Sequence, residues 1–170
     1  DNPVAQAEAQ YYRIETLPIP DGLSLEIGGM APMPDGRLGV ITRRGEIWII
    51  ENPTLAGGAR PTFTRFASGL HEPLGLAYRD GDFYASQRSE LTRIRDTNGD
   101  GKADLYETVY AWPLSGNYHE YSYGPLFTPQ GNMLVWLNLG WAGRGVSIAP
   151  WRGWTVEITP DGKLTFSKVD

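Results

Sequence analysis

The chain has 170 residues, of which 41% are hydrophobic and 21% charged, a balance typical of a globular rather than a disordered protein. Fifteen basic and twenty acidic residues give a net charge of −5, and no stripe of Lys and Arg is present to meet phosphates, so nucleic acid is not expected as a partner. The absence of cysteine excludes disulfides and thiolate metal sites, and no apolar run approaches the roughly 18 residues of a membrane span.

The first 21 residues differ in composition from the rest. Residues 1–10 are rich in Ala and Gln and are expected to form a tail or a short helical lead-in. The segment Tyr11–Thr16 is predicted as a strand, which could serve as the outer strand of a closing blade. Because the sequence starts with Asp1-Asn2-Pro3 and lacks an initiator Met, we interpret it as processed or as a portion of a precursor.

From residue 22 onward one unit recurs three times. Each unit has an apolar strand, a turn centred on glycine, a second strand, and further strands with apolar or aromatic centres. The turns are Pro34-Asp35-Gly36, Arg79-Asp80-Gly81-Asp82 and Pro129-Gln130-Gly131-Asn132, and their glycines lie 45 and then 50 residues apart. A period of about 40–50 residues with roughly four short strands is typical of β-propeller blades.

The predicted fold class is therefore all-β, a partial β-propeller of about three four-stranded antiparallel blades over residues 22–170. The blades are expected at about 25–66, 73–110 and 121–169. The predicted strands are Glu26–Met33, Leu38–Thr42, Glu46–Ile50, Thr62–Phe66, Leu74–Tyr78, Phe83–Ser86, Leu91–Arg95, Leu105–Tyr110, Tyr121–Phe127, Met133–Leu137, Trp154–Ile158 and Leu164–Ser167. A β-sandwich with as many strands stays open, although the regular period favours the propeller. Because propellers close with roughly 4–8 blades, the remaining blades are expected from another chain or from a second copy.

Strands within a blade alternate in direction, so the connections sort onto two faces. Links between blades share one face with the turns between second and third strands, and we call this the link face. Both histidines, His71 and His119, lie on links that enter a first strand, and the long insertion from Leu139 to Gly153 lies on the same face. Long loops on a rigid scaffold are where functional sites are commonly built.

The acidic run from Asp96 to Glu107 matches the twelve-residue calcium loop, with Gly101 at the sharp turn. The expected ligands are the side chains of Asp96, Asn98, Asp100, Asp104 and Glu107 and the carbonyl of Lys102. The flanks are predicted strands, so the site would be a structural, calcium-clamped hairpin on the face opposite the link face. A polar turn without an ion is the alternative.

His119 is the candidate general base, because an imidazole at the mouth of a central cavity can take a proton near neutral pH. A structural, hydrogen-bonded histidine is the alternative, and His71 is a weaker candidate whose alternative is packing against the next blade.

Basic and aromatic side chains on the link face are candidates for ligand binding. Guanidinium groups could hold an anionic ligand, and indoles could stack on a sugar or a flat cofactor. The arginines are Arg43, Arg44, Arg88, Arg144 and Arg152, and the tryptophans are Trp141, Trp151 and Trp154. Solvated arginines, and indoles that pack the insertion onto its blade, are the alternatives.

The run His119–Leu137, HEYSYGPLFTPQGNMLVWL, resembles the glucose/sorbosone dehydrogenase family. In that family a His precedes a Gly-x-Leu-x-Phe-x-Pro-x-Gly-x-Leu-type strand–turn–strand. The segment Gly69–Ala77, GLHEPLGLA, and the acidic loop 96–104 also resemble the bacterial secreted branch of these proteins. The likeness covers about residues 22–170. In the family the strand after the turn commonly ends in Gly-Asp, whereas here Gly140 is followed by Trp141.

This resemblance implies a six-bladed propeller, pyrroloquinoline quinone (PQQ) as cofactor, a sugar or small alcohol as substrate, and a periplasmic or secreted location. It implies that His119 takes the substrate hydroxyl proton while hydride passes to the quinone. Arg88, Arg144 and Trp141 are then the candidate cofactor-binding residues. The alternative is a non-catalytic propeller that acts as a binding or scaffold subunit of a larger assembly.

Overall fold

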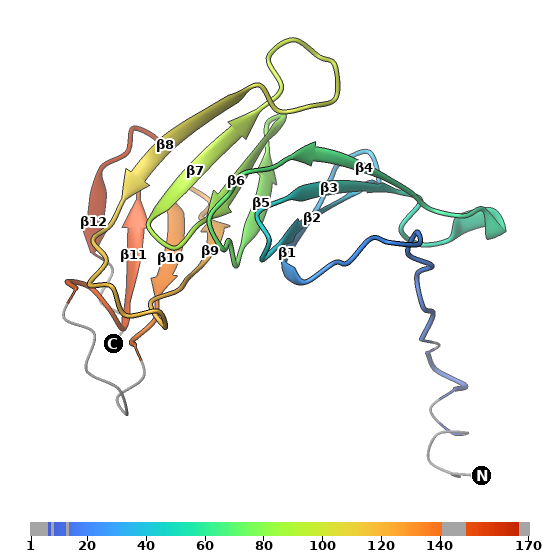
Figure 1. Ribbon diagram of the computed structural model, residues 1–170, viewed down its shortest axis with the longest axis horizontal. Helices are drawn as coiled ribbons and strands as arrows, with labels where there is room; N and C mark the ends of the chain where they lie inside the picture. Colours follow the sequence, from blue (N-terminus) through green and yellow to red (C-terminus); the bar gives the residue numbers. More distant parts are fainter. Residues whose placement is uncertain (1–6, 8, 13, 141–148, 167–170) are drawn as a thin grey trace.

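The computed structural model describes residues 7, 9–12, 14–140 and 149–166, and it is an all-β partial β-propeller of three four-stranded antiparallel sheets (Figure 1). Each sheet is a meander of consecutive strands, so hydrogen-bonded neighbours are also neighbours in sequence. One 3-10 turn, η1 (Ala56–Gly58), lies in the connection between β3 and β4. No helix in the described part of the chain has the length and apolarity needed to cross a membrane.

The strand bounds follow the predicted positions closely. The first sheet contains β1 (Ile27–Pro32), β2 (Leu38–Thr42), β3 (Ile47–Glu51) and β4 (Thr62–Ala67). The second contains β5 (Leu76–Arg79), β6 (Asp82–Ser86), β7 (Glu90–Arg95) and β8 (Leu105–Ala111). The third contains β9 (Ser122–Phe127), β10 (Met133–Leu137), β11 (Trp154–Ile158) and β12 (Leu164–Phe166). The sequence pattern therefore predicted the fold class and all twelve strands, with differences of one or two residues at some ends.

The N-terminal segment is the exception. Residues 11, 12 and 14–16, expected within a strand, form none, and the side chains of Tyr11 and Ile14 are each 86% exposed. A strand needs a partner for its backbone N–H and C=O groups, and the sheets described here offer none to this segment.

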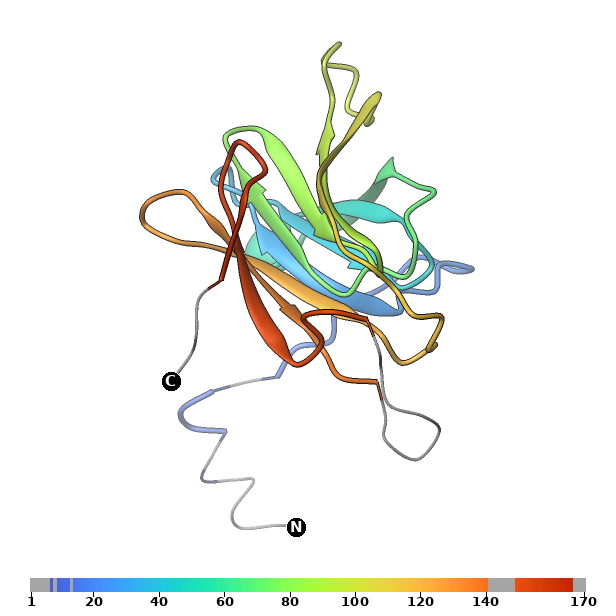
Figure 2. The ribbon, with the colours of Figure 1, turned by 90° about the vertical axis from the view of Figure 1, so that its left-hand side faces the viewer.

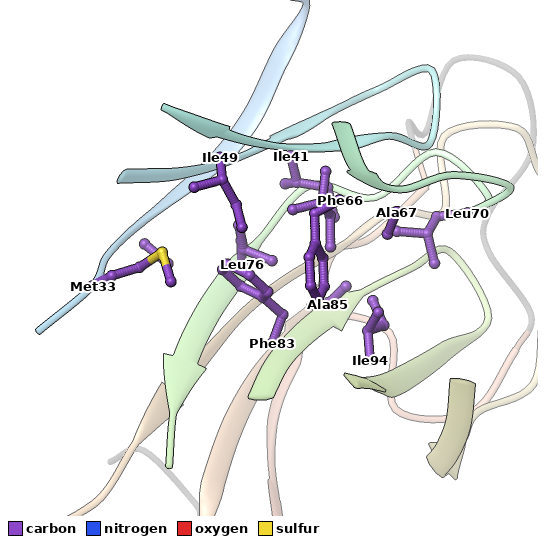
Figure 3. Close-up of a cluster of buried hydrophobic side chains, with 12 residues drawn as sticks. Met33, Ile41, Ile49, Phe66, Ala67, Leu70, Leu76, Phe83, Ala85 and Ile94 are labelled. Atoms are coloured by element: carbon purple, nitrogen blue, oxygen red, sulfur yellow. The ribbon is translucent and has the colours of Figure 1, made fainter. Parts of the chain in front are cut away.

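The first and second sheets pack face to face over an apolar core (Figure 3). Ile41 and Ile49 of the first sheet face Leu76 and Phe83 of the second, because alternate residues of a strand point to the same side of its sheet. Phe83 is 1% exposed, and its ring meets Phe66 edge-on with centroids 5.2 Å apart. Burying one such side chain contributes about 1.5–3 kcal/mol, so this layer fixes the two sheets together.

A second core joins the second and third sheets. It is built from buried side chains on both sides, namely Leu91, Trp112, Met133, Val135, Leu137, Val156 and Ile158. Tyr84 of β6 meets Phe127 of β9 edge-on, with ring centroids 5.0 Å apart. The second sheet therefore lies between the other two, as successive blades of one fan (Figure 1), and Figure 2 views the fan with the third sheet toward the reader.

The first strands of the three sheets approach one another at the inner edge of this fan. Leu74, just before β5, forms an isolated parallel bridge with Tyr123 of β9. Gly75 lies so close to the next sheet that a Cβ atom there would come within 1.8 Å of the carbonyl oxygen of Gly124. A Cβ on Gly29 of β1 would likewise lie 2.8 Å from the backbone nitrogen of Leu76. Glycine is required at these positions because backbone meets backbone.

Candidate functional site

The link face of the structure gathers polar residues from four connections. Arg43 lies in the β2–β3 turn, Glu72 in the β4–β5 link, Arg88 in the β6–β7 turn and Asn117 in the β8–β9 link. Hydrogen bonds join them in that order: Arg43 to Glu72, Glu72 to Arg88, and Arg88 to Asn117. The prediction that these connections share a face is confirmed by these contacts, and both histidines lie on the links concerned.

Arg88 is the centre of this group. Its Nη1 donates to Glu72 Oε2 at 2.8 Å, and its Nη2 donates to the backbone oxygen of Asn117 at 3.0 Å. The guanidinium also lies over the ring of Tyr121, 5.2 Å from the ring centroid. The side chain is 13% exposed, so Arg88 binds protein groups on each side rather than extending into solvent.

Glu72 is held between two arginines. Its second oxygen accepts from Arg43 Nη2 at 3.2 Å, and its backbone is in the left-handed region with φ of 40°. The hydrogen bond from Arg88 is the main cause that lowers the pKa of the Glu72 carboxyl, with a smaller contribution from Arg43 and with burial acting in the opposite direction. Glu72 is therefore ionised at neutral pH and joins the first two blades at their link-face ends.

His119 is half-buried on the β8–β9 link, two residues after Asn117. Its backbone nitrogen donates to Asn117 Oδ1 at 3.0 Å, and its ring stacks on that of Tyr118 at a tilt, with centroids 4.0 Å apart. The described geometry thus places the imidazole on the link face, directly before the innermost strand of the third sheet. Its predicted role as a general base is compatible with this position.

His71 is exposed on the β4–β5 link. Its backbone nitrogen donates to Gln87 Oε1 at 2.5 Å, and its carbonyl accepts from the backbone nitrogen of Arg88 at 3.3 Å. Gln87 is in turn buried and donates to Thr92 at 2.7 Å. The backbone of His71 therefore binds the β4–β5 link to the second blade. This agrees with the alternative in which His71 packs against the next blade.

Arg152 and Glu120 form the buried part of the same face. Arg152 is 6% exposed and donates to the carbonyl oxygens of Tyr121 at 2.9 Å and Pro113 at 3.4 Å. Burial lowers the pKa of its guanidinium, the charge of Glu120 opposes this effect, and the charge of Arg88 adds to it. Glu120 is fully buried and accepts from the backbone and hydroxyl of Ser115. These residues fix the shape of the β8–β9 link.

Several of the predicted ligand-binding residues have other roles or lie outside the described part. Trp141 and Arg144 fall in residues 141–148, outside the described residues. Trp151 and Trp154 both lie against Phe166 of β12, with ring centroids 5.7 Å and 6.0 Å apart, so they pack on the third blade. Arg44 pairs with Glu26 at 3.2 Å on the exposed surface.

The acidic loop between β7 and β8 folds around Asp96. Its carboxylate accepts from the backbone nitrogens of Gly99 and Gly101 at 2.7 Å and 2.8 Å. The backbone nitrogen of Asp100 donates to Asn98 Oδ1, and the backbone nitrogen of Lys102 donates to Asp100 Oδ1. Asp104 accepts from both the backbone and the hydroxyl of Thr97, which lowers the pKa of its carboxyl.

Glu107, the ligand expected at position 12 of the loop, does not join the loop's hydrogen bonds. It lies on β8 and pairs with Arg95 at 3.6 Å and, more distantly, with Arg93 at 4.0 Å. Within the described residues no three His, Cys, Asp or Glu side chains are gathered closely enough to hold a metal ion. The calcium site stays a prediction, with Asp96, Asn98, Asp100, Asp104 and the Lys102 carbonyl as its remaining ligands.

The loop also contacts the first sheet. The backbone nitrogen of Ala103 donates to the carbonyl of Phe66 at 2.8 Å, and the Tyr106 hydroxyl bonds both backbone groups of Ser68. The last part of the loop and the start of β8 therefore pack against the end of β4, the outermost strand of the first sheet. The loop itself projects beyond the sheets (Figure 1). The twist of the sheets explains this, because the outer strands are rotated away from the direction of the inner ones.

A pocket of about 480 Å³ is present in the described structure, and His119 is not among the residues that line it. It opens between the second and third sheets and is lined by turn residues of the opposite face, among them Arg79, Gln130 and Gly162. Arg79 lies over the ring of Phe127, 4.8 Å from its centroid, and also pairs with the exposed Asp80. A second pocket, about 440 Å³, lies beside Arg44 and Glu46 of the β2–β3 turn, and His119 does not line it either.

The polar network around Arg88 was only partly foreseeable. The sequence identified Arg88 as basic and placed it on the link face, but it gave no reason to select Glu72 or Asn117. Their roles depend on contacts between connections that are 16 and 29 residues apart. Buried charged side chains need hydrogen-bond partners, and this requirement identifies Glu72 and Asn117 as partners of Arg88. It can be applied only once the structure shows which side chains are buried.

Known structures share this fold. The chain is similar to a protein of Thermus thermophilus assigned as an oxidoreductase (glucose dehydrogenase), with a TM-score of 0.62 and 18% identity over 84% of this chain and 45% of that one. It is also similar to the PQQ-bound form of aldose sugar dehydrogenase from Streptomyces coelicolor, with a TM-score of 0.60 and 18% identity over 83% of this chain and 46% of that one. The chain thus spans less than half the length of either protein. No family model and no curated protein matches it.

Proposed function

We propose that this chain forms part of a PQQ-dependent sugar or alcohol dehydrogenase-like propeller, with His119 as the general base. One observation carries the proposal: His119 lies on the link face, at the entry to an innermost strand, in a fold shared with a PQQ-bound aldose sugar dehydrogenase. A link that enters an innermost strand lies near the axis of the ring, where a substrate held by several blades would be bound.

The part assigned to His119 is proton transfer. A substrate hydroxyl within hydrogen-bond reach of the imidazole would lose its proton to the ring nitrogen as the carbon–hydrogen bond breaks. When bound, PQQ supplies the two-electron acceptor for the hydride. The chain's own contribution is then to hold the imidazole, orient the hydroxyl and accept its proton.

An anionic cofactor would be bound through guanidinium groups of this face. Arg43, Arg88 and Arg152 supply such groups, which suit a ligand that carries carboxylates. However, both terminal nitrogens of Arg88 already bind protein groups. Direct contacts with the cofactor are therefore assigned to Arg43, half of whose side chain is exposed, and to the predicted Arg144 and Trp141.

Further blades would complete the ring. The outward face of the third sheet carries Tyr123 (40% exposed), Leu126 (58%) and Trp136 (39%), and Tyr123 is the direct partner of Trp136 across β9 and β10. Ile27 and Met30 of β1 are likewise more than half exposed. Exposed apolar sheet faces favour association, and both similar structures are about twice as long as this chain. Another chain, a second copy or further blades of the same protein would cover these faces. With this function a periplasmic or secreted location is expected.

A binding or scaffold role is the second candidate. It is favoured by the internal use of Arg88, whose terminal nitrogens stabilise the links instead of facing a ligand. In that case the propeller would serve as a rigid platform, and exchange of His119 would have no catalytic consequence.

The test is cofactor binding and turnover by the full-length protein. PQQ with calcium should change the absorbance spectrum on binding, and aldoses should then reduce an artificial electron acceptor. His119→Gln should decrease kcat by roughly 10²–10⁴-fold, the usual contribution of a general base, with His71→Gln as the matched control. The absence of PQQ binding by the complete propeller would eliminate the dehydrogenase proposal and favour the scaffold role.

A further inference from the structure

We infer that Arg88 is a positioning residue, which holds the β8–β9 link so that the His119 imidazole keeps one place on the link face. The inference adds a role to the proposed site and rests on the proposed function only where it concerns turnover. It is based on the contacts of Arg88 along the whole link.

Arg88 contacts the link at its start, middle and end. At the start, the indole nitrogen of Trp112 donates to the Arg88 carbonyl at 2.7 Å. In the middle, the guanidinium donates to the Asn117 carbonyl at 3.0 Å. At the end, the Ser122 hydroxyl donates to the Arg88 carbonyl at 3.3 Å, and the Tyr121 ring lies under the guanidinium. The link is thereby attached at three points to one residue of the preceding sheet.

Asn117 transmits this attachment to His119. Its carbonyl accepts from Arg88 and also from the backbone nitrogen of Glu120 at 3.1 Å, while its side-chain oxygen accepts from the backbone nitrogen of His119. The backbone nitrogen of Tyr121 then donates to the His119 carbonyl at 3.1 Å. His119 thus lies inside a tight turn whose first residue is bound by the Arg88 guanidinium.

The guanidinium itself is fixed. It is 13% exposed, its other terminal nitrogen is bound to Glu72 at 2.8 Å, and Glu72 is bound in turn by Arg43. Charge-assisted bonds of this kind are stronger than neutral ones, and the planar fork of arginine lets one side chain bind two partners in fixed directions. Lysine at this position would keep the positive charge but could not bind both Glu72 and Asn117 in the directions that the planar guanidinium provides.

Hydrogen exchange of the full-length protein tests the inference directly. In Arg88→Gln, amides of residues 114–121 should exchange about tenfold faster or more, because a bond from a charged group is lost, while those of β2, β6 and β10 stay near wild type. Arg88→Lys should give an intermediate acceleration. Arg65→Gln is the control: it removes the ion pair of Arg65 with Glu46 (3.1 Å), which lies outside the link, and should leave the exchange of residues 114–121 unchanged. Unchanged exchange in Arg88→Gln, or an equal acceleration in all sheets, would overturn the inference.

Imidazole NMR gives an independent measurement. The chain has two histidines, so the signals of His119 are assigned by comparison with His71→Gln. Arg88→Gln should broaden or shift the His119 ring signals, and Arg65→Gln should not. If Arg88→Gln does not fold, Glu72→Gln replaces it. This change removes the negative charge that holds the guanidinium but keeps the bond of the guanidinium to Asn117, so a smaller acceleration confined to residues 114–121 is expected. Exchange in that variant equal to wild type would overturn the inference.

Turnover separates this role from the proposed function. In an active protein, Arg88→Gln should lower kcat with little change in the KM for the sugar, and Arg88→Lys should recover part of the loss. A change confined to KM would indicate a binding role and contradict positioning. If the protein binds no PQQ, the exchange and NMR results still decide the positioning role, so the two proposals fail separately.

Discussion

Gly75 and Gly124 lie in direct backbone contact where the innermost strands of the second and third sheets approach each other. A Cβ atom built on Gly75 would lie 1.8 Å from the Gly124 oxygen and 2.6 Å from its nitrogen. Because the obstacle is backbone, no rotation of a side chain can relieve it. The spacing between these two blades is therefore set by the absence of a side chain.

Gly75→Ala is expected to destabilise the chain by about 3 kcal/mol or more, because the inner strands must move apart and disturb both cores. Urea denaturation followed by tryptophan fluorescence measures the change. Gly22→Ala is the control: Gly22 has φ of 81° and nothing within 4 Å of a built Cβ, so only backbone strain of about 1 kcal/mol is expected. Equal effects of the two substitutions would contradict the close contact.

Glu72 should make the stability of the protein dependent on pH in the acidic range. Its pKa is lowered from 4.5, chiefly by the hydrogen bond from Arg88, so the folded state binds this proton less readily than the unfolded chain. The resulting stabilisation is complete above pH 4.5 and is lost as the pH falls through the lowered value.

The comparison of wild type with Glu72→Gln isolates this effect. The difference between their urea midpoints should be largest near neutral pH and should shrink steadily on acidification below 4.5. Asp35→Asn is the control, since Asp35 pairs with Arg37 in an exposed turn, where ion pairs contribute little. A midpoint difference that stays constant between neutral and acidic pH would show that Glu72 does not titrate as described.

Calcium should stabilise the chain if the acidic loop binds it. Saturation at about 100 times the dissociation constant corresponds to about 2.7 kcal/mol, which raises Tm by several degrees, and a chelator should reverse the rise. Asp96→Asn should abolish the response because Asp96 is the carboxylate around which the loop folds. Glu107→Gln should preserve it, since Glu107 pairs with Arg95. A Tm that does not respond to millimolar calcium would favour a polar turn without an ion.

Trp136 should matter for assembly more than for the stability of the chain itself. Its side chain is 39% exposed on the outward face of the third sheet, so Trp136→Ser is expected to change the urea midpoint only slightly. Association with a second copy or with further blades should weaken, because the apolar face is reduced. Light scattering over a range of concentrations measures the mass, with Tyr11→Ser as the control for an exposed aromatic residue outside the sheets. An unchanged mass distribution in Trp136→Ser would contradict this use of the face.

The strands were predictable because each sheet is made from alternating apolar residues and well-marked turns. Gly36, Gly81 and Gly131 all have positive φ, as their turns require, and the strands on either side start where the sequence pattern indicates. Local chemistry decides these elements, so one sequence was sufficient to find them. Tyr11–Thr16 has the same aromatic and β-branched composition, but among the described residues no strand pairs with residues 11, 12 or 14–16, and composition does not report on partners.

The site was less predictable because it depends on which polar groups become buried together. Glu107 matches the last position of a calcium loop, yet Arg93 and Arg95 on the adjacent strand offer it cationic partners. Arg88 was expected to face a ligand, and burial instead gives it Glu72 and Asn117. The side-chain partners come from neighbouring strands and connections, and sequence spacing alone does not reveal them.

The consecutive order of strands within each sheet has a consequence for biosynthesis. Since within each described sheet every strand pairs only with the strands that directly precede or follow it, each sheet can form its hydrogen bonds as soon as its last strand has emerged from the ribosome. A truncated nascent chain ending after residue 111 would already contain the complete interface between its first two sheets. Folding can then proceed in the direction of translation, with each new sheet added to a finished neighbour.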